Sequence, residues 1–204
     1  PAMSEQMVVA RAEGPYIYDK QGKRYLEGMA GLWCTALGYG NEEIIEAAER
    51  QMRELSFSHM FGGKTHSSAI ALADKLAAMV PMQDGRVFLG NSGSDANDTL
   101  LKLIRYHAEA SGQPNRIKVI AREQGYHGVT LASAALTAIP TNHAHFQLPF
   151  EALGVLRTGS ASYYRGANDG ESEAEFVARR AQELEALILA EGPETIAAMI
   201  AEPV

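Results

Sequence analysis

The feature that most constrains this chain is residues 86–98, where an apolar run leads through a Ser-Gly-Ser turn into a helical pattern. The run at 87–89 predicts a short buried strand, and Gly93 lets the backbone approach a ligand closely. One point would then bring together free backbone N–H groups, the hydroxyls of Ser92 and Ser94, and the positive end of the helix. Such a point suits a phosphate dianion. The alternative without a ligand is that Ser94 only caps the helix.

The segments that follow alternate between strand and helix patterns. The expected order is strand 87–89, helix 94–111, strand 118–121, helix 130–138, helix 173–190 and strand 196–201. Such alternation predicts right-handed crossovers and an α/β fold with a mostly parallel sheet. Residues 144–170 show no clear period and are expected to be loop-rich. In sheets of this kind, ligands bind beyond the carboxyl ends of the strands.

The N-terminal part has a different pattern. Residues 15–26 predict a hairpin, and helices are expected to begin at Asn41 and at Ser67 or Ser68. We therefore place a boundary near Ser56: residues 1–55 form part of a small α+β domain, and 56–204 the first part of a large α/β domain. Because the apolar run 196–201 stands at the end of the sequence, we expect the chain to belong to a longer protein.

Composition excludes several classes of function. The net charge is −7 without any block of Lys or Arg, which argues against nucleic acid as a partner. No apolar run approaches the ~18 residues that span a bilayer, so no membrane association is expected. The single cysteine, Cys34, suits a reducing compartment, and we expect a cytoplasmic protein.

Several familiar motifs are incomplete. Residues 62–65 resemble the end of a Walker A loop, but Ser58 stands where its first glycine is required. Residues 90–94 resemble a hydrolase nucleophile elbow, but Ser94 replaces its last glycine. Residues 38–40 lack the third glycine of a dinucleotide fingerprint. His143 and His145 are too isolated for a metal site, and none is predicted.

Three further positions are candidates for a ligand site. Tyr126 lies between glycines after a predicted strand and could stack on a planar ring; the alternative is a half-buried turn tyrosine. Glu202 follows the last predicted strand, where it could organise a ligand or remain a surface charge. Trp33 lies among glycines. It could line a substrate pocket, or it could be part of a hydrophobic core.

Together these segments resemble the class III (ω-) aminotransferases, pyridoxal-phosphate (PLP) enzymes of fold type I, in the amine:pyruvate and ω-amino acid:pyruvate branch. The resemblance rests on residues 15–27, 28–40, 91–98, 126–128 and 201–204. No one of these motifs identifies the family by itself, but the presence of all five in the family's order is specific for it. One difference is Asp95, which stands where the family usually has Glu.

The resemblance implies roles for these residues. Those that would bind the cofactor are Ser92, Gly93, Ser94, Tyr126, His127 and Glu202. The serines and Gly93 would hold the phosphate, and Tyr126 would stack on the pyridine ring. Glu202 would support the aspartate that pairs with the pyridine nitrogen. Trp33, Phe61 and Tyr126 would shape the substrate pocket of a homodimer, in which Phe61 reaches the other subunit's site.

The resemblance also implies that the Schiff-base lysine and the aspartate for the pyridine nitrogen lie beyond Val204. This stretch would then hold the cofactor but be catalytically silent by itself. For the parent protein we expect transfer of an amino group from a primary amine or ω-amino acid to a keto acid such as pyruvate. The alternatives are an aminomutase, racemase or decarboxylase on the same scaffold, or a non-catalytic phosphate-ligand-binding α/β module if the natural chain ends at Val204.

Overall fold

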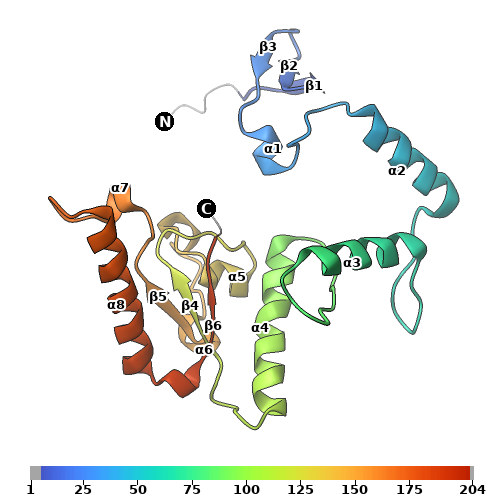
Figure 1. Cartoon of the computed structure of the whole chain (residues 1–204). Helices are drawn as coiled ribbons and strands as arrows, with labels where there is room; N and C mark the ends of the chain where they lie inside the picture. The colour runs from blue at the N-terminus through green and yellow to red at the C-terminus, as the bar shows by residue number, and fades with distance from the viewer. Residues whose placement is uncertain (1–5, 203–204) are drawn as a thin grey trace. The chain divides into compact units, whose positions relative to one another are not determined.

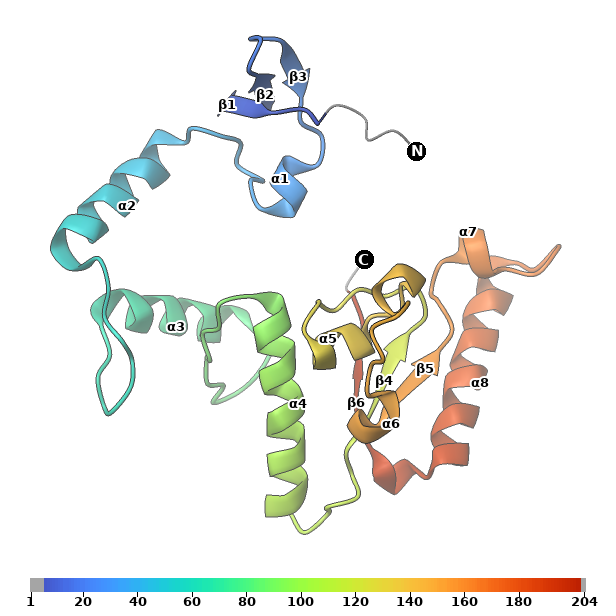
Figure 2. The same ribbon diagram turned by 180° about the vertical axis from the view of Figure 1, so that it is seen from behind.

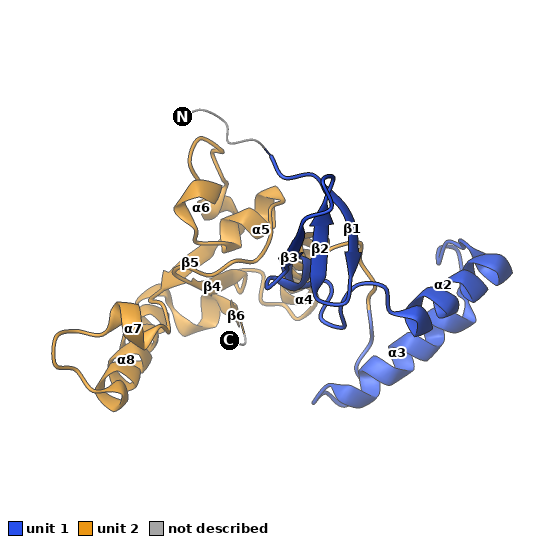
Figure 3. Ribbon diagram, turned by 90° about the horizontal axis from the view of Figure 1, so that it is seen from above, with its two compact units in different colours: residues 1–87 blue, residues 88–204 orange. Residues whose placement is uncertain are grey.

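The computed structural model describes residues 6–202, which form two compact units, Pro1–Val87 and Phe88–Val204 (Figure 3). These two units divide between residues 87 and 88, and the predicted boundary near Ser56, with 1–55 in a small and 56–204 in a large domain, stays a prediction. None of the helices within residues 6–202 is long and apolar enough to cross a membrane.

The first unit contains an antiparallel sheet and two longer helices. Strands β1 (Val9–Glu13), β2 (Tyr16–Asp19) and β3 (Arg24–Leu26) pair in chain order, which confirms the predicted hairpin. Helices α2 (Glu42–Leu55) and α3 (Ser67–Met79) follow. The Asn41 side chain accepts a hydrogen bond from the Ile44 amide at 3.2 Å, and so Asn41 caps α2 as expected.

The short element α1 (Ala30–Trp33) is a left-handed turn. Its four residues have φ values of 48°, 62°, 58° and 69° in chain order. Only Gly31 adopts such angles freely, whereas each of the other three carries a steric cost of roughly 1–2 kcal/mol. Backbone strain of this size persists only where surrounding contacts fix it, and such segments concentrate at functional sites.

The second unit is built around a parallel sheet with the strand order β5-β4-β6. Strand β4 (Lys118–Arg122) pairs in parallel with β5 (Val155–Thr158) and with β6 (Ile196–Ile200). The sheet lies between α8 (Glu173–Glu191) on one side and α4 (Gly93–Ala110) and α5 (Leu131–Leu136) on the other (Figures 1 and 2). The parallel α/β arrangement predicted from the sequence is therefore confirmed.

The core of this unit forms where α4 and α5 meet the sheet. Leu101, Val119 and Leu136 make a buried cluster, and partly buried Val155 and Ile200 pack against it. Each strand and both helices contribute to this cluster. This packing fixes the carboxyl ends of the strands relative to the amino ends of the helices. A ligand site at this edge of the sheet requires such a fixed arrangement.

One expectation was wrong. Residues 87–89 form no strand, because no neighbouring strand within residues 6–202 supplies a hydrogen-bond ladder for them. Residues 144–170 are loop-rich as expected, but they also contain three short elements that were not predicted: α6 (Phe150–Leu153), β5 and α7 (Tyr163–Gly166). β5 has only four residues, all half-buried, so it lacks the alternation by which a strand is recognised.

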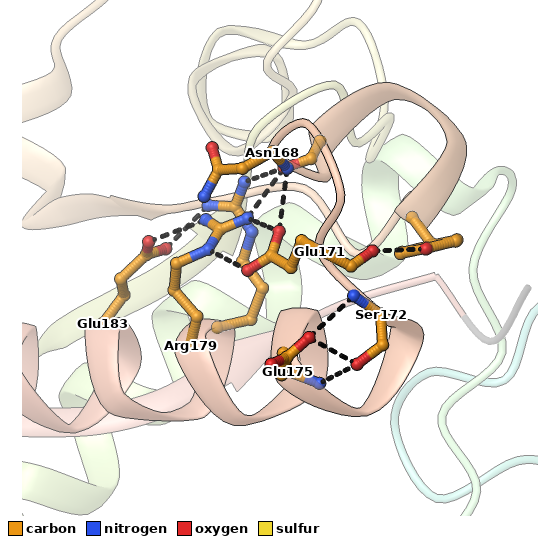
Figure 4. Close-up of polar contacts among 9 residues, drawn as sticks. Asn168, Glu171, Ser172, Glu175, Arg179 and Glu183 are labelled. Carbon is orange, nitrogen blue, oxygen red and sulfur yellow. Dashed lines mark hydrogen bonds and ion pairs between the residues drawn. The ribbon is translucent and has the colours of Figure 1, made fainter.

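A polar network joins α7 to the start of α8 (Figure 4). Arg179 donates from Nε and Nη2 to the two carboxylate oxygens of Glu171, both at 2.7 Å, and from Nη2 to the Gly166 carbonyl at 2.9 Å. These bonds from Arg179 lower the pKa of Glu171 to about 2. Ser172 caps α8 by accepting from the Glu175 amide. The network fixes the segment that connects β5 to α8.

Candidate phosphate and ring site

The turn at residues 91–94 caps α4 through Ser92 and not through Ser94. The Ser92 hydroxyl accepts from the Asp95 amide at 3.1 Å, and the Asp95 carboxylate accepts from the Asn91 amide at 3.0 Å. The expectation that Ser94 might be the cap is therefore wrong. Because Ser94 is the second residue of the helix and does not cap it, its hydroxyl can take another role.

The first turn of α4 presents unpaired donors. Within residues 6–202 the amides of Gly93 and Ser94 have no hydrogen-bond partner, as expected at a helix start. A Cβ built on Gly93 would meet no protein atom within 4 Å, so the space above this residue is open. Open space, free amides and the positive helix end together provide a cradle for an anion.

Three side chains on one face of α4 hold the loop that carries Tyr126. The Ser94 hydroxyl accepts from the Val129 amide at 3.0 Å, and Asn97 Nδ2 donates to the His127 carbonyl at 2.6 Å. Asp98 Oδ1 accepts from the Thr130 hydroxyl at 2.6 Å and from the Ser133 amide at 3.0 Å. Ser94, Asn97 and Asp98 recur at helical spacing, so one rigid face positions the whole loop.

Gly128 is required for this contact. Its φ is 131°, and an added Cβ would lie 2.6 Å from the Ser94 hydroxyl and even closer to that of Ser133. No side chain larger than hydrogen fits between the helix start and the loop. The glycine in the Tyr-His-Gly sequence therefore serves the close approach of two backbone segments.

The other end of the loop is fixed by buried polar contacts. The fully buried Thr137 hydroxyl accepts from the His127 amide at 2.8 Å and donates to the Gly128 carbonyl at 3.1 Å. Arg157, on β5, donates to the carbonyls of Ala135, Leu136 and Thr137 at the end of α5. These contacts leave the Tyr126 backbone little freedom.

Glu202 joins the end of β6 to the same loop. Its Oε1 accepts from the Tyr126 amide at 2.9 Å. The neighbouring His127 is buried, and its Nε2 has no partner within residues 6–202. Burial lowers the pKa of His127, Glu202 opposes that shift, and Arg157 adds to it. The imidazole is therefore held neutral near neutral pH beside a carboxylate.

The six residues predicted to bind the cofactor thus lie in one unit, and the contacts of Ser94 with Val129 and of Asn97 with His127 connect the start of α4 to the loop of Tyr126 and Glu202. Tyr126 is 45% exposed. Trp33 and Phe61 lie in the first unit, where their side chains are 76% and 84% exposed. Their assignment to a substrate pocket stays a prediction. His143, considered for metal binding, instead contacts the Thr137 carbonyl through Nε2 at 2.6 Å.

The chain matches the family described as Aminotransferase class-III over residues 2–204. It belongs to the class III aminotransferases. A probable γ-aminobutyrate transaminase 2 of Oryza sativa subsp. indica, designated mitochondrial, is 47% identical over 201 residues, which are 98% of this chain and 40% of the relative. A γ-aminobutyrate transaminase 1 of Solanum lycopersicum, also designated mitochondrial, is 46% identical over 98% of this chain.

Solved structures show the same fold. The ω-transaminase from Pseudomonas jessenii, in complex with PMP, superposes with a TM-score of 0.93 at 50% identity, covering 98% of this chain and 44% of that one. An ω-aminotransferase from Paracoccus denitrificans gives 0.90 at 42% identity, covering 97% of this chain and 43% of that one. The fold is therefore fold type I, and this chain spans less than half the length of these relatives.

Class III aminotransferases are PLP-dependent enzymes, and the arrangement at the start of α4 fits a phosphate-bearing cofactor. The open cradle over Gly93 and the two free amides are the donors and the space that a phosphate needs. Sequence reasoning assigned no role to Asn97, Asp98 or Arg157. The first two could have been found from their spacing to Ser94, whereas Arg157 lies on the strand that was not predicted.

Proposed function

We propose that the full-length protein carrying this chain is a PLP-dependent transaminase. It would move an amino group from a primary amine or ω-amino acid to a keto acid such as pyruvate. The observation that carries the proposal is the cradle at Gly93 and Ser94, tied directly to the loop that presents Tyr126. When bound, the cofactor supplies a ring that accepts electrons from the substrate carbon.

The chain's own residues would bind and orient that cofactor. Because the Ser94 hydroxyl accepts from the Val129 amide, its proton is directed away from Val129 and can be donated to a phosphate oxygen. The amides of Gly93 and Ser94 would add two more donors to the same phosphate. Tyr126 would cover one face of the ring, and Glu202, which already fixes the Tyr126 amide, would lie beneath it.

The substrate pocket is part of the proposal. A Pseudomonas jessenii ω-transaminase variant engineered for asymmetric synthesis of enantiopure bulky amines carries, among others, a tryptophan and a phenylalanine substitution. Those two positions are 28 residues apart, and so are Trp33 and Phe61. This agreement supports a pocket bordered by Trp33 and Phe61. We further propose a homodimer and a cytoplasmic location, which rest on the family resemblance and on the single cysteine.

The test uses the full-length protein loaded with PLP. Addition of a primary amine without keto acid should change the absorbance of the bound cofactor, and subsequent addition of pyruvate should restore it. Absence of any response to a panel of primary amines and ω-amino acids would refute the transaminase. A response that never requires a keto acid would favour an aminomutase, racemase or decarboxylase instead.

Cofactor binding is tested separately with Ser94→Ala. Loss of a hydroxyl that bonds a charged phosphate corresponds to roughly tenfold to a hundredfold weaker PLP binding. Ser111→Ala is the matched control, because the Ser111 hydroxyl only contacts the His107 carbonyl at the far end of α4. PLP affinity, measured by titration of the apoprotein, should fall for Ser94→Ala alone. Equal affinities for both variants would contradict the phosphate assignment.

A further inference from the structure

We propose that Glu27 is a positioning residue that sets which amines the protein accepts, by holding the strained turn that carries Trp33. The inference rests on the proposed function, because it takes Trp33 as a wall of the substrate pocket. It adds a residue that makes no contact with substrate itself. The argument begins with the left-handed backbone of α1, whose four consecutive positive φ angles would relax without a restraint.

Glu27 supplies the restraint from one side. Its Oε1 accepts from the Met29 amide at 3.0 Å and its Oε2 from the Gly31 amide at 2.5 Å. The two oxygens of one carboxylate therefore bind the start and the middle of the turn. The Glu27 amide in turn donates to the Pro15 carbonyl at 2.9 Å, which anchors Glu27 beside the sheet of the first unit.

The other side of the turn is closed by packing. The Thr35 amide donates to the Ala30 carbonyl at 2.8 Å. A Cβ added to Gly31 would lie 2.9 Å from the Thr35 hydroxyl and 3.1 Å from the Tyr39 hydroxyl, so these two side chains lie close to the turn. The Glu27 carboxylate and the contacts with Thr35 therefore hold the turn from two sides.

The direction of Trp33 depends on this backbone. Its amide donates to the Met29 carbonyl at 2.9 Å, but its indole is 76% exposed and makes no hydrogen bond or aromatic contact within residues 6–202. The turn therefore decides where the ring lies. If Glu27 released the turn, Trp33 would lose its fixed direction, and discrimination between large and small amines would change.

The experiment is a double-mutant cycle in the full-length protein loaded with PLP. Glu27→Gln keeps the shape of the side chain but places an amide donor against one of the two backbone N–H groups. The measured quantity is the ratio of kcat/KM for a bulky aryl-alkyl amine to that for a small amine. We expect Glu27→Gln to change this ratio at least fivefold when Trp33 is present and less than twofold in a Trp33→Gly background.

A second readout does not depend on activity. Hydrogen exchange of the amides in residues 29–33 should accelerate at least tenfold in Glu27→Gln. Glu13→Gln is the matched control: its carboxylate only pairs with Arg11 on an exposed part of the same unit, and it should change neither readout. Unchanged exchange in Glu27→Gln, or an equal effect in both Trp33 backgrounds, would overturn the inference.

The outcomes also separate this inference from the proposed function. If Trp33→Gly leaves the selectivity ratio unchanged, the inference is overturned, while transamination itself still stands. If no amine is transaminated, the proposed function fails, and with it the inference about selectivity. In that case accelerated exchange would show only that Glu27 holds the turn.

Discussion

Arg157 is expected to be essential for the loop that carries Tyr126, although it lies on β5 and is not one of the residues predicted to bind the cofactor. Its guanidinium donates to the carbonyls of Ala135, Leu136 and Thr137, all of which are buried. In Arg157→Met the Thr137 carbonyl keeps its contact with His143. The other two carbonyls have no further partner within residues 6–202. Two orphaned buried carbonyls at about 1–3 kcal/mol each destabilise the loop by about 2–6 kcal/mol.

The assay is hydrogen exchange of residues 126–138 in the full-length protein. Since each factor of ten in an opening equilibrium corresponds to about 1.4 kcal/mol, exchange should accelerate by about thirtyfold even at the lower limit. Arg105→Met is the matched control, because Arg105 donates to one exposed carbonyl, that of Ala152, and should cost much less. Exchange within threefold of the wild type in Arg157→Met would refute the reasoning.

Two further substitutions test other parts of the second unit. Asp98→Ala removes the acceptor for the Thr130 hydroxyl and the Ser133 amide and should lower the free energy of unfolding by about 2–3 kcal/mol, whereas Asp98→Asn, which keeps Oδ1, should lower it less. Denaturant titration measures both, and an equal loss for Asn and Ala would contradict the role of Oδ1. Glu171 has a pKa of about 2 against an ordinary 4.5, so its contribution to stability is complete above pH 4.5 and is lost as the pH falls toward 2. The difference in unfolding temperature between wild type and Glu171→Gln should therefore shrink over that range, and a constant difference would contradict the assigned pKa.

The sequence was informative where a local pattern decides the structure. The start of α4 is predicted because two serines and a glycine after an apolar run are compatible with few local structures. β4 and β6 follow from short apolar runs, and α8 follows from apolar residues at helical spacing. The identity of the cap was not predictable in the same way. Ser92 and Ser94 both suit an N-cap, and the contact between Ser94 and Val129, 35 residues later, is a tertiary one.

Other features depend on contacts that no local pattern encodes. β5 is a strand because its residues pair with β4, as Ile120 does with Leu156, and its own sequence shows no alternation. The segment 87–89 has the apolar character of a strand but no partner within the described residues. The left-handed turn at Ala30–Trp33 contains one glycine and has hydrogen bonds to Glu27 and Thr35, so the positive φ of its other residues could not be predicted from residue types.

The loop that carries Tyr126 shows how one short helix can organise a site. α5 has six residues, too few to be stable alone in water. The Ser133 amide in its first turn donates to Asp98 of α4, and its last carbonyls accept from Arg157 of β5. Because these partners lie on elements that share the buried core, α5 depends on its contacts with α4 and the sheet for its stability. The position of the loop that carries Tyr126 therefore depends on packing of the whole unit, and so we expect residues that never touch a ligand to affect ligand binding.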